Sequence, residues 1–194
     1  MRADARFGGA PMKRIILSRP SRPTASAAAP VHDDFGMPVV ARASGAERLV
    51  GLGFRYWLTG FRTGDLGCWE RAWNAYAHAL GACGAKGAIT DLSCWVRAIS
   101  RHARRDLETG TVDCANFCRD ECVAIAMIAA CQHNACPAMR ACAFSLLGCA
   151  MIDEVVEGAE TFAATMRKAE QVLQPSFAPA ATLSALAAPT AALQ

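Results

Sequence analysis

Apolar residues recur every three to four positions through the middle of this chain, which is the period of a helix with one buried face. The period holds from Ser44 to Leu173, and no alternation of apolar and polar residues competes with it. Short breaks rich in glycine, asparagine or helix-capping residues divide this region into six segments. The helices expected are Ser44–Arg62, Asp65–Gly81, Ala85–Arg105, Asp113–His133, Pro137–Cys149 and Asp153–Leu173.

The second of these segments carries a stripe of large apolar residues, spaced three and four positions apart. We predict that the stripe is the buried face of its helix and that Trp69 and Trp73 lie in the core. Aromatic residues are frequent across the first three segments, where they form either core or a groove for a partner. The stripe consists of Leu66, Trp69, Trp73, Tyr76 and Leu80.

The two ends of the chain lack this period. Residues 1–43 and 174–194 are rich in proline, alanine and serine, a composition typical of disordered tails. The pattern therefore predicts an all-α fold, a compact bundle of five or six helices over residues 44–173, with disordered N- and C-terminal tails.

Charge is distributed unevenly between the predicted tail and the predicted domain. Residues 1–42 hold seven Lys/Arg against three Asp/Glu, whereas the remainder holds thirteen against fourteen. A nearly neutral domain lacks the basic surface that nucleic-acid binding requires. The longest apolar run, Cys122–Cys131, is ten residues, too short to cross a membrane. We expect a cytoplasmic protein with reduced thiols, although residues 1–30 also fit an organellar targeting segment.

Cysteine is the residue type that brings candidate chemistry into this picture. The chain has ten cysteines, of which Cys114, Cys118 and Cys122 are spaced four apart and would form a row on one helix. A short turn at residues 134–135 predicts an antiparallel hairpin that places Cys149 opposite Cys122. Thiolates gathered in this way favour a soft metal: zinc, copper(I) or an iron–sulfur cluster. The alternatives are a redox or disulfide role, and simple packing, because cysteine is often a small buried apolar residue.

A helical row of this kind resembles the cysteine rows of bacterial copper storage proteins. The resemblance covers residues 114–122 and the helical class, and it implies copper as the ligand. Those proteins line several helices with such pairs, and this chain does not.

Two other polar clusters are weighed in the same way. The triplet Arg119-Asp120-Glu121 is expected to face solvent or to form an interhelical ion pair. His133 lies near Cys131 and Cys136, and the simplest interpretation is a histidine at a helix C-terminus. The chain has no glycine-rich phosphate loop, no Gly-x-Ser-x-Gly elbow and no His-Glu-x-x-His motif, so no ordinary catalytic constellation is visible.

These observations favour a non-enzymatic helical interaction protein, regulatory or adaptor-like, with an unidentified protein partner. The pattern also allows a homo-oligomer. The alternative function is cysteine-based metal binding or redox sensing, with Cys114, Cys118, Cys122 and Cys149 as the candidate ligands of a soft metal ion.

Overall fold

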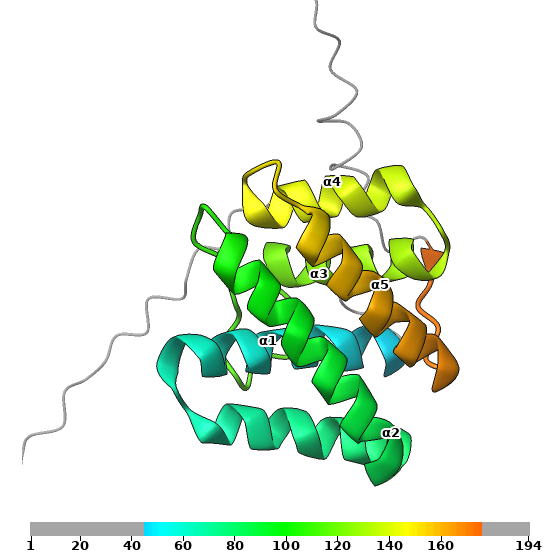
Figure 1. Cartoon of the computed structure of the whole chain (residues 1–194). Helices are drawn as coiled ribbons and strands as arrows, with labels where there is room; N and C mark the ends of the chain where they lie inside the picture. Colours follow the sequence, from blue (N-terminus) through cyan, green and yellow to red (C-terminus); the bar gives the residue numbers. More distant parts are fainter. Residues whose placement is uncertain (1–44, 176–194) are drawn as a thin grey trace, which may run out of the picture. The chain divides into compact units, whose positions relative to one another are not determined.

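The computed structural model of this chain describes residues 45–175. Over these residues the protein forms five helices and no strand, which confirms the predicted all-α bundle (Figure 1). The helices are α1 (Gly45–Thr63), α2 (Leu66–His102), α3 (Arg119–Gln132), α4 (Cys136–Leu147) and α5 (Asp153–Lys168). The predicted tails lie outside the described residues, apart from Gln174 and Pro175, and so does the predicted cap Ser44.

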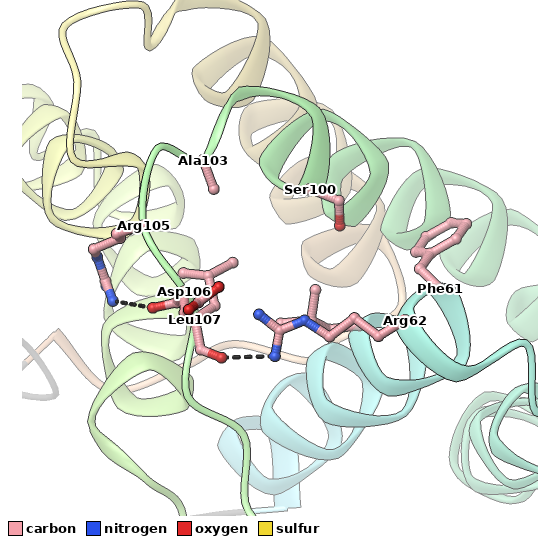
Figure 2. Close-up of a pocket in the computed structure, with 8 residues that line it drawn as sticks. Phe61, Arg62, Ser100, Ala103, Arg105, Asp106 and Leu107 are labelled. Carbon is pink, nitrogen blue, oxygen red and sulfur yellow. Dashed lines mark hydrogen bonds between the residues drawn. The ribbon is translucent and has the colours of Figure 1, made fainter.

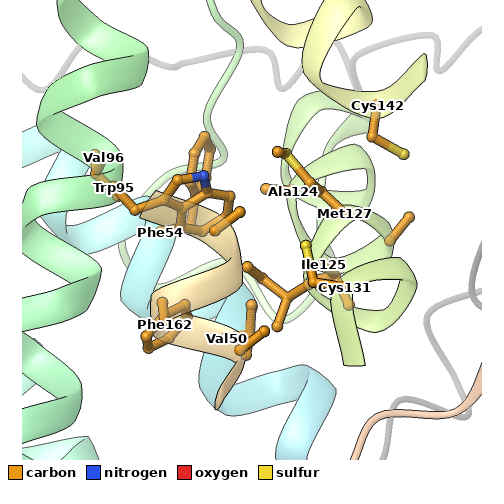
Figure 3. Packing of buried hydrophobic residues seen from close by; sticks show 14 of the residues in the cluster. Val50, Phe54, Trp95, Val96, Ala124, Ile125, Met127, Cys131, Cys142 and Phe162 are labelled. Atoms are coloured by element: carbon orange, nitrogen blue, oxygen red, sulfur yellow. The ribbon is translucent and has the colours of Figure 1, made fainter. Parts of the chain in front are cut away.

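The central element of the bundle is α3. It packs against α1, α4 and α5, and Figure 1 shows it between α4 and α1, with α5 crossing in front. Around it, the aromatic ring of Trp95 lies 5.8 Å from the rings of both Phe54 and Phe162, measured between centroids. These residues form the core shown in Figure 3, where helices distant in sequence share one apolar interior. No helix within residues 45–175 is long and apolar enough to span a membrane.

The second and third predicted helices form one element, α2, with a kink. At Gly81 the backbone takes φ 72° and ψ 161°, a conformation that glycine adopts without steric cost. The chain changes direction there, so the first half of α2 packs along α1 while the second half crosses to α5 (Figure 1). The predicted break at Gly81 is thus present as a kink. The C-terminus of α2 comes at His102, three residues before the predicted Arg105.

The fourth predicted helix begins later than expected. Its first residue is Arg119, and Asp113 lies in the irregular segment before it, so the prediction that this helix begins at Asp113 is wrong. Cys118 is the N-cap residue, and its backbone N–H donates to the Glu121 carboxylate at 2.8 Å. A glutamate at the third helical position that bonds back to the cap fixes the start of the helix there.

The last helix ends earlier than expected, at Lys168 instead of Leu173. Glu170 adopts φ 59°, which stops the helix and turns the chain back over α3. Gln132 then holds the returning segment, because its side-chain amide donates to Gln171 O at 2.9 Å and accepts from Leu173 N at 2.8 Å. At the end of this segment Gln174 N donates to the Glu47 carboxylate, also buried, at 2.7 Å.

The first half of α2 approaches α1 closely through small residues. Gly53 of α1 lies against the Tyr76 ring, and Gly60 lies against the Trp69 indole, so that a Cβ at either glycine would collide with the ring. The buried residues of this half of α2 are Cys68, Ala72 and Tyr76, and Trp69 packs beside them against Gly60. The glycines that weaken α1 as an isolated helix therefore let the two backbones pack side by side.

The predicted buried stripe on this half of α2 is consequently wrong in part. Tyr76 is fully buried and Trp69 is half-buried, but Trp73 is 39% exposed and Leu66 is 66% exposed. The rings of Tyr76 and Trp69 fit against α1 because Gly53 and Gly60 leave room for them. Leu66 and Trp73 lie at the flank of this contact, where they are exposed.

Candidate functional site

The predicted row of cysteines does not form. Because α3 begins at Arg119, Cys114 lies in the preceding irregular segment, Cys118 is the cap, and only Cys122 is helical. Cys149 lies just after α4, which ends at Leu147. The helical spacing on which the four-thiol site was predicted is therefore absent.

Three of the four sulfur atoms have separate hydrogen-bond acceptors. The thiol of Cys118 donates to Glu108 O at 3.0 Å, that of Cys122 to Phe117 O at 3.9 Å, and that of Cys149 to His102 O at 3.6 Å. Burial raises the pKa of Cys118 to about 12 and that of Cys122 to about 11, which disfavours the thiolate that binds metals. Within residues 45–175 no three His, Cys, Asp or Glu side chains are grouped so that they could hold a metal ion. The predicted soft-metal site gains no support from this geometry.

The remaining cysteines divide into buried and exposed sets. Cys131 and Cys142 face the interior between α3 and α4 (Figure 3), where burial raises their pKa values to about 12 and about 11. Cys68 is also buried, as expected of a packing residue. Cys83, Cys94 and Cys136 are exposed instead. His133 at the end of α3 contacts Leu173 O at 2.8 Å, in keeping with its interpretation as a residue of the helix C-terminus.

The most elaborate polar structure surrounds the segment that joins α2 to α3, residues 103–118, which we call the braced loop. Arg55 of α1 is completely buried and donates to both carboxylate oxygens of Glu121, at 2.7 Å and 2.8 Å. The same guanidinium donates to three carbonyl oxygens of the braced loop, those of residues 111, 114 and 116. Glu121 also accepts from the backbone N–H groups of Gly110 and Cys118. One buried ion pair therefore fixes the backbone of the loop at five points.

A second ion pair holds the beginning of the braced loop. Arg105 donates to both oxygens of the buried Asp120, at 2.9 Å and 2.6 Å, and Asp120 also accepts from Glu108 N at 2.7 Å. Arg105 further donates to Ser145 O at the end of α4. An irregular connection of this length usually serves a function or is mobile, and these bonds hold it in one conformation.

The predicted interhelical ion pair in the Arg119-Asp120-Glu121 triplet is confirmed, since Glu121 of α3 pairs with Arg55 of α1. Arg119 faces solvent. Arg55 was not predicted from the sequence as a site residue. Its signal was a lone charge between Phe54 and Tyr56 in a largely apolar helix, where an arginine needs a partner if it is buried.

Aromatic side chains gather where the C-terminal half of α1 meets the first half of α2. Trp57, Phe61 and Trp69 contact one another with ring centroids 5.5–6.1 Å apart, and the Arg97 guanidinium lies 5.9 Å from the Phe61 centroid. Trp73 follows Trp69 by one helical turn and so extends the same surface outward. We call Trp57, Phe61, Trp69 and Trp73 the aromatic patch. It lies beside Leu66, the most exposed large apolar residue described.

A cavity of about 240 Å³ opens beside this patch, at the base of the braced loop (Figure 2). Phe61 belongs to both features. The guanidinium of Arg62 reaches from α1 toward the braced loop and donates to Leu107 O at 2.7 Å. The lining comes from α1, α2 and the braced loop, and includes Leu58, Phe61, Arg62, Ser100, Asp106 and Leu107.

In comparisons with known proteins, no family model, curated protein or solved structure matches the chain.

Proposed function

We propose that the protein is a non-enzymatic interaction protein, regulatory or adaptor-like, that binds an apolar helix of a partner protein on the aromatic patch. The observation that carries this proposal is the exposure of Trp73, 39%, and of Leu66, 66%, on a helix whose other large apolar side chains are at least partly buried. Tryptophan is the residue type most enriched at the centres of protein interfaces. A tryptophan exposed next to a cluster of aromatic rings is a ready anchor for a partner.

The shape of the exposed surface favours a helical partner. Leu66 and Trp73 are two helical turns apart on one face of α2, so the apolar surface follows the helix axis. Helical partners present apolar residues at the same spacing. Arg97 lies over Phe61 and has no ion pair among the described residues, so an acidic residue flanking the partner's apolar stripe would complement it.

Two indole N–H groups of the patch are unpaired within the described residues, a feature that they share with Trp95 in the core. The indole N–H groups of Trp57 and Trp69 are buried and have no hydrogen-bond acceptor in the part of the chain described. Leaving such donors unpaired costs free energy on folding. The alternative function, cysteine-based metal binding or redox sensing, draws no comparable support. The thiols of Cys118, Cys122 and Cys149 each donate to a different backbone carbonyl and not to a shared centre.

The experiment compares two exposed apolar sites on the full chain. Trp73→Ala removes the anchor, whereas Met151→Ala removes a 63% exposed side chain outside the aromatic patch. Proteins recovered with the tagged wild-type chain from its own cells are quantified for both variants, and the specific partner is then purified and its affinity measured. We expect Trp73→Ala to weaken binding roughly thirtyfold, as loss of a central tryptophan does, and Met151→Ala to leave the affinity unchanged.

Equal affinity of the wild-type chain and Trp73→Ala for every purified partner would overturn the proposal. The partner could also be a second copy of this chain, which sedimentation of the purified protein tests. If the wild-type chain forms a dimer and the Trp73→Ala variant is a monomer, the partner helix belongs to a second copy.

A further inference from the structure

We propose that the cavity at the base of the braced loop binds a small zwitterion, a free amino acid. This site is distinct from the aromatic patch, although Phe61 borders both. Two charged side chains that line the cavity, Arg62 and Asp106, have no ion-pair partner among the described residues.

The first of these charges is Arg62. One of its terminal nitrogens donates to Leu107 O, and this is the single hydrogen bond that the side chain makes within the described chain. No carboxylate of residues 45–175 forms an ion pair with it. The guanidinium therefore keeps free N–H donors and an uncompensated positive charge at the cavity (Figure 2).

The second charge is Asp106. Its backbone carbonyl accepts from Arg105, but its carboxylate has no hydrogen bond and no ion pair in the described part of the chain. Asp106 and Arg62 line the same cavity without pairing with each other. Arg105, which also lines the cavity, is neutralised by Asp120 on two bonds.

Two opposite and separated charges select for a ligand that carries both. A simple anion on Arg62 would be repelled by Asp106, and a simple cation on Asp106 would be repelled by Arg62. A zwitterion places its carboxylate on the guanidinium and its ammonium group on the carboxylate, so both charges gain a partner.

The rest of the lining sets the size and polarity of the ligand. Leu58 and Leu107 are almost fully buried and offer little surface to a ligand, so Phe61 provides the main apolar contact in a lining that is otherwise largely polar. The volume of about 240 Å³ is below the roughly 300–1,000 Å³ of pockets that take drug-sized molecules. A free amino acid of modest size suits both properties.

The braced loop makes this cavity a prepared site. Arg105 and Asp106 lie on a backbone that Asp120 holds through Arg105 and Glu108. Because this part of the cavity wall is already ordered, binding does not have to offset the entropy lost in ordering it.

The test titrates the full chain with small-molecule probes. Binding is measured from the amide chemical shifts of residues around the cavity in ¹H–¹⁵N NMR spectra. The probes are L-leucine, isoamylamine, which lacks the carboxylate, and isocaproic acid, which lacks the ammonium group. We expect saturable shifts at Ser100 and Leu107 with leucine, and at least tenfold weaker binding of both analogues.

Two variants separate the site from its surroundings. Asp106→Asn keeps the backbone bond to Arg105 and should fold normally, yet bind leucine roughly tenfold more weakly and no better than isocaproic acid. The matched control Glu108→Gln removes the same charge two residues away, outside the lining, and should bind leucine as the wild-type chain does. The proposal is overturned if leucine gives no saturable shifts, if either analogue binds as well as leucine, or if Asp106→Asn retains full affinity.

Discussion

The helix α3 and the first half of α2 are both apolar in sequence, yet one is the centre of the bundle and the other is its edge. Every residue of α3 except Arg119 is buried, including its two carboxylates. The first half of α2 buries only a narrow face, made of Cys68, Ala72 and Tyr76, and exposes Leu66 and Trp73. Burial therefore follows the position of a helix in the bundle more closely than the size of its apolar residues: α3 is covered by α1, α4 and α5, whereas the first half of α2 packs along α1.

The difference also concerns charge. In α3 the carboxylates of Asp120 and Glu121 are buried because Arg105 and Arg55 meet them with matched pairs of N–H donors. On the first half of α2 the charged Glu70 and Arg71 face solvent. Buried polar residues in this protein fix the braced loop, whereas exposed apolar residues mark the surface proposed for a partner. Four predictions test this contrast, from the largest expected effect to the smallest.

Removing one member of the central ion pair should have the largest effect. Glu121→Ala leaves the buried Arg55 charge without its partner, and the free energy of unfolding should fall by about 3–5 kcal/mol in urea denaturation. The double variant Arg55→Met with Glu121→Leu removes both charges and should be less destabilised than the single variant. A loss of under about 1 kcal/mol in Glu121→Ala would show that the pair does not hold the loop.

Truncating an aliphatic residue of α3 should come next. Ile128 is fully buried, so Ile128→Ala should lower the free energy of unfolding by about 2–5 kcal/mol. Circular dichroism at increasing urea concentration measures the loss, with the exposed Val172→Ala as the control. A cost similar to that of the control would contradict the central position of α3.

Alkaline pH should destabilise the protein through the thiols of α3. Burial raises the pKa of Cys122 to about 11 and that of Cys131 to about 12, above the value of about 8.5 for a free thiol. Their contribution to stability is complete below about pH 8.5 and is lost as the pH rises toward these folded values, by about 1 kcal/mol per pH unit and thiol. The urea midpoint of unfolding is measured from pH 8 to 10.5, and each protein is compared with its own midpoint at pH 8. The midpoint of the double variant Cys122→Ala, Cys131→Ala should fall less steeply than that of the wild-type chain. The exposed Cys83→Ala should keep the wild-type slope.

The smallest effect is expected on the first half of α2. Trp73→Ala should cost about 1 kcal/mol and Leu66→Ala less than about 0.5 kcal/mol, although tryptophan is far larger than Ile128. Thermal melts of both variants give this comparison directly. If Trp73→Ala lowers the stability as much as Ile128→Ala, the indole is packed more deeply than its exposure indicates, and the aromatic patch is core.

The fold was predictable because helical period and capping residues act locally. Period alone identified the helices, and the break at Gly81 appeared where a glycine interrupts the pattern. The start of α3 was not predictable in this way. Asp113 is a good cap in isolation, but the helix begins at Arg119 because Glu121 binds Arg55, which lies 66 residues away in sequence.

The candidate sites depend on the same kind of distant contact. The cysteine row required a helix that begins six residues earlier than α3 does, so an error in one boundary removed the whole predicted arrangement. Trp73 was placed in the core because large apolar residues usually mark the buried face. The actual face depends on Gly53 and Gly60 of α1, whose closeness to α2 no single helix pattern reveals.

The hydrogen bond between Gln174 and Glu47 has a consequence for how the protein is made. It joins residues separated by 127 positions, so the first turn of α1 leaves the ribosome long before its partner is synthesised. Glu47 and the start of α1 cannot complete their packing until the chain beyond α5 has emerged. Folding during translation can assemble the α1–α2 hairpin early. The hydrogen bond between Gln174 and Glu47 then forms last.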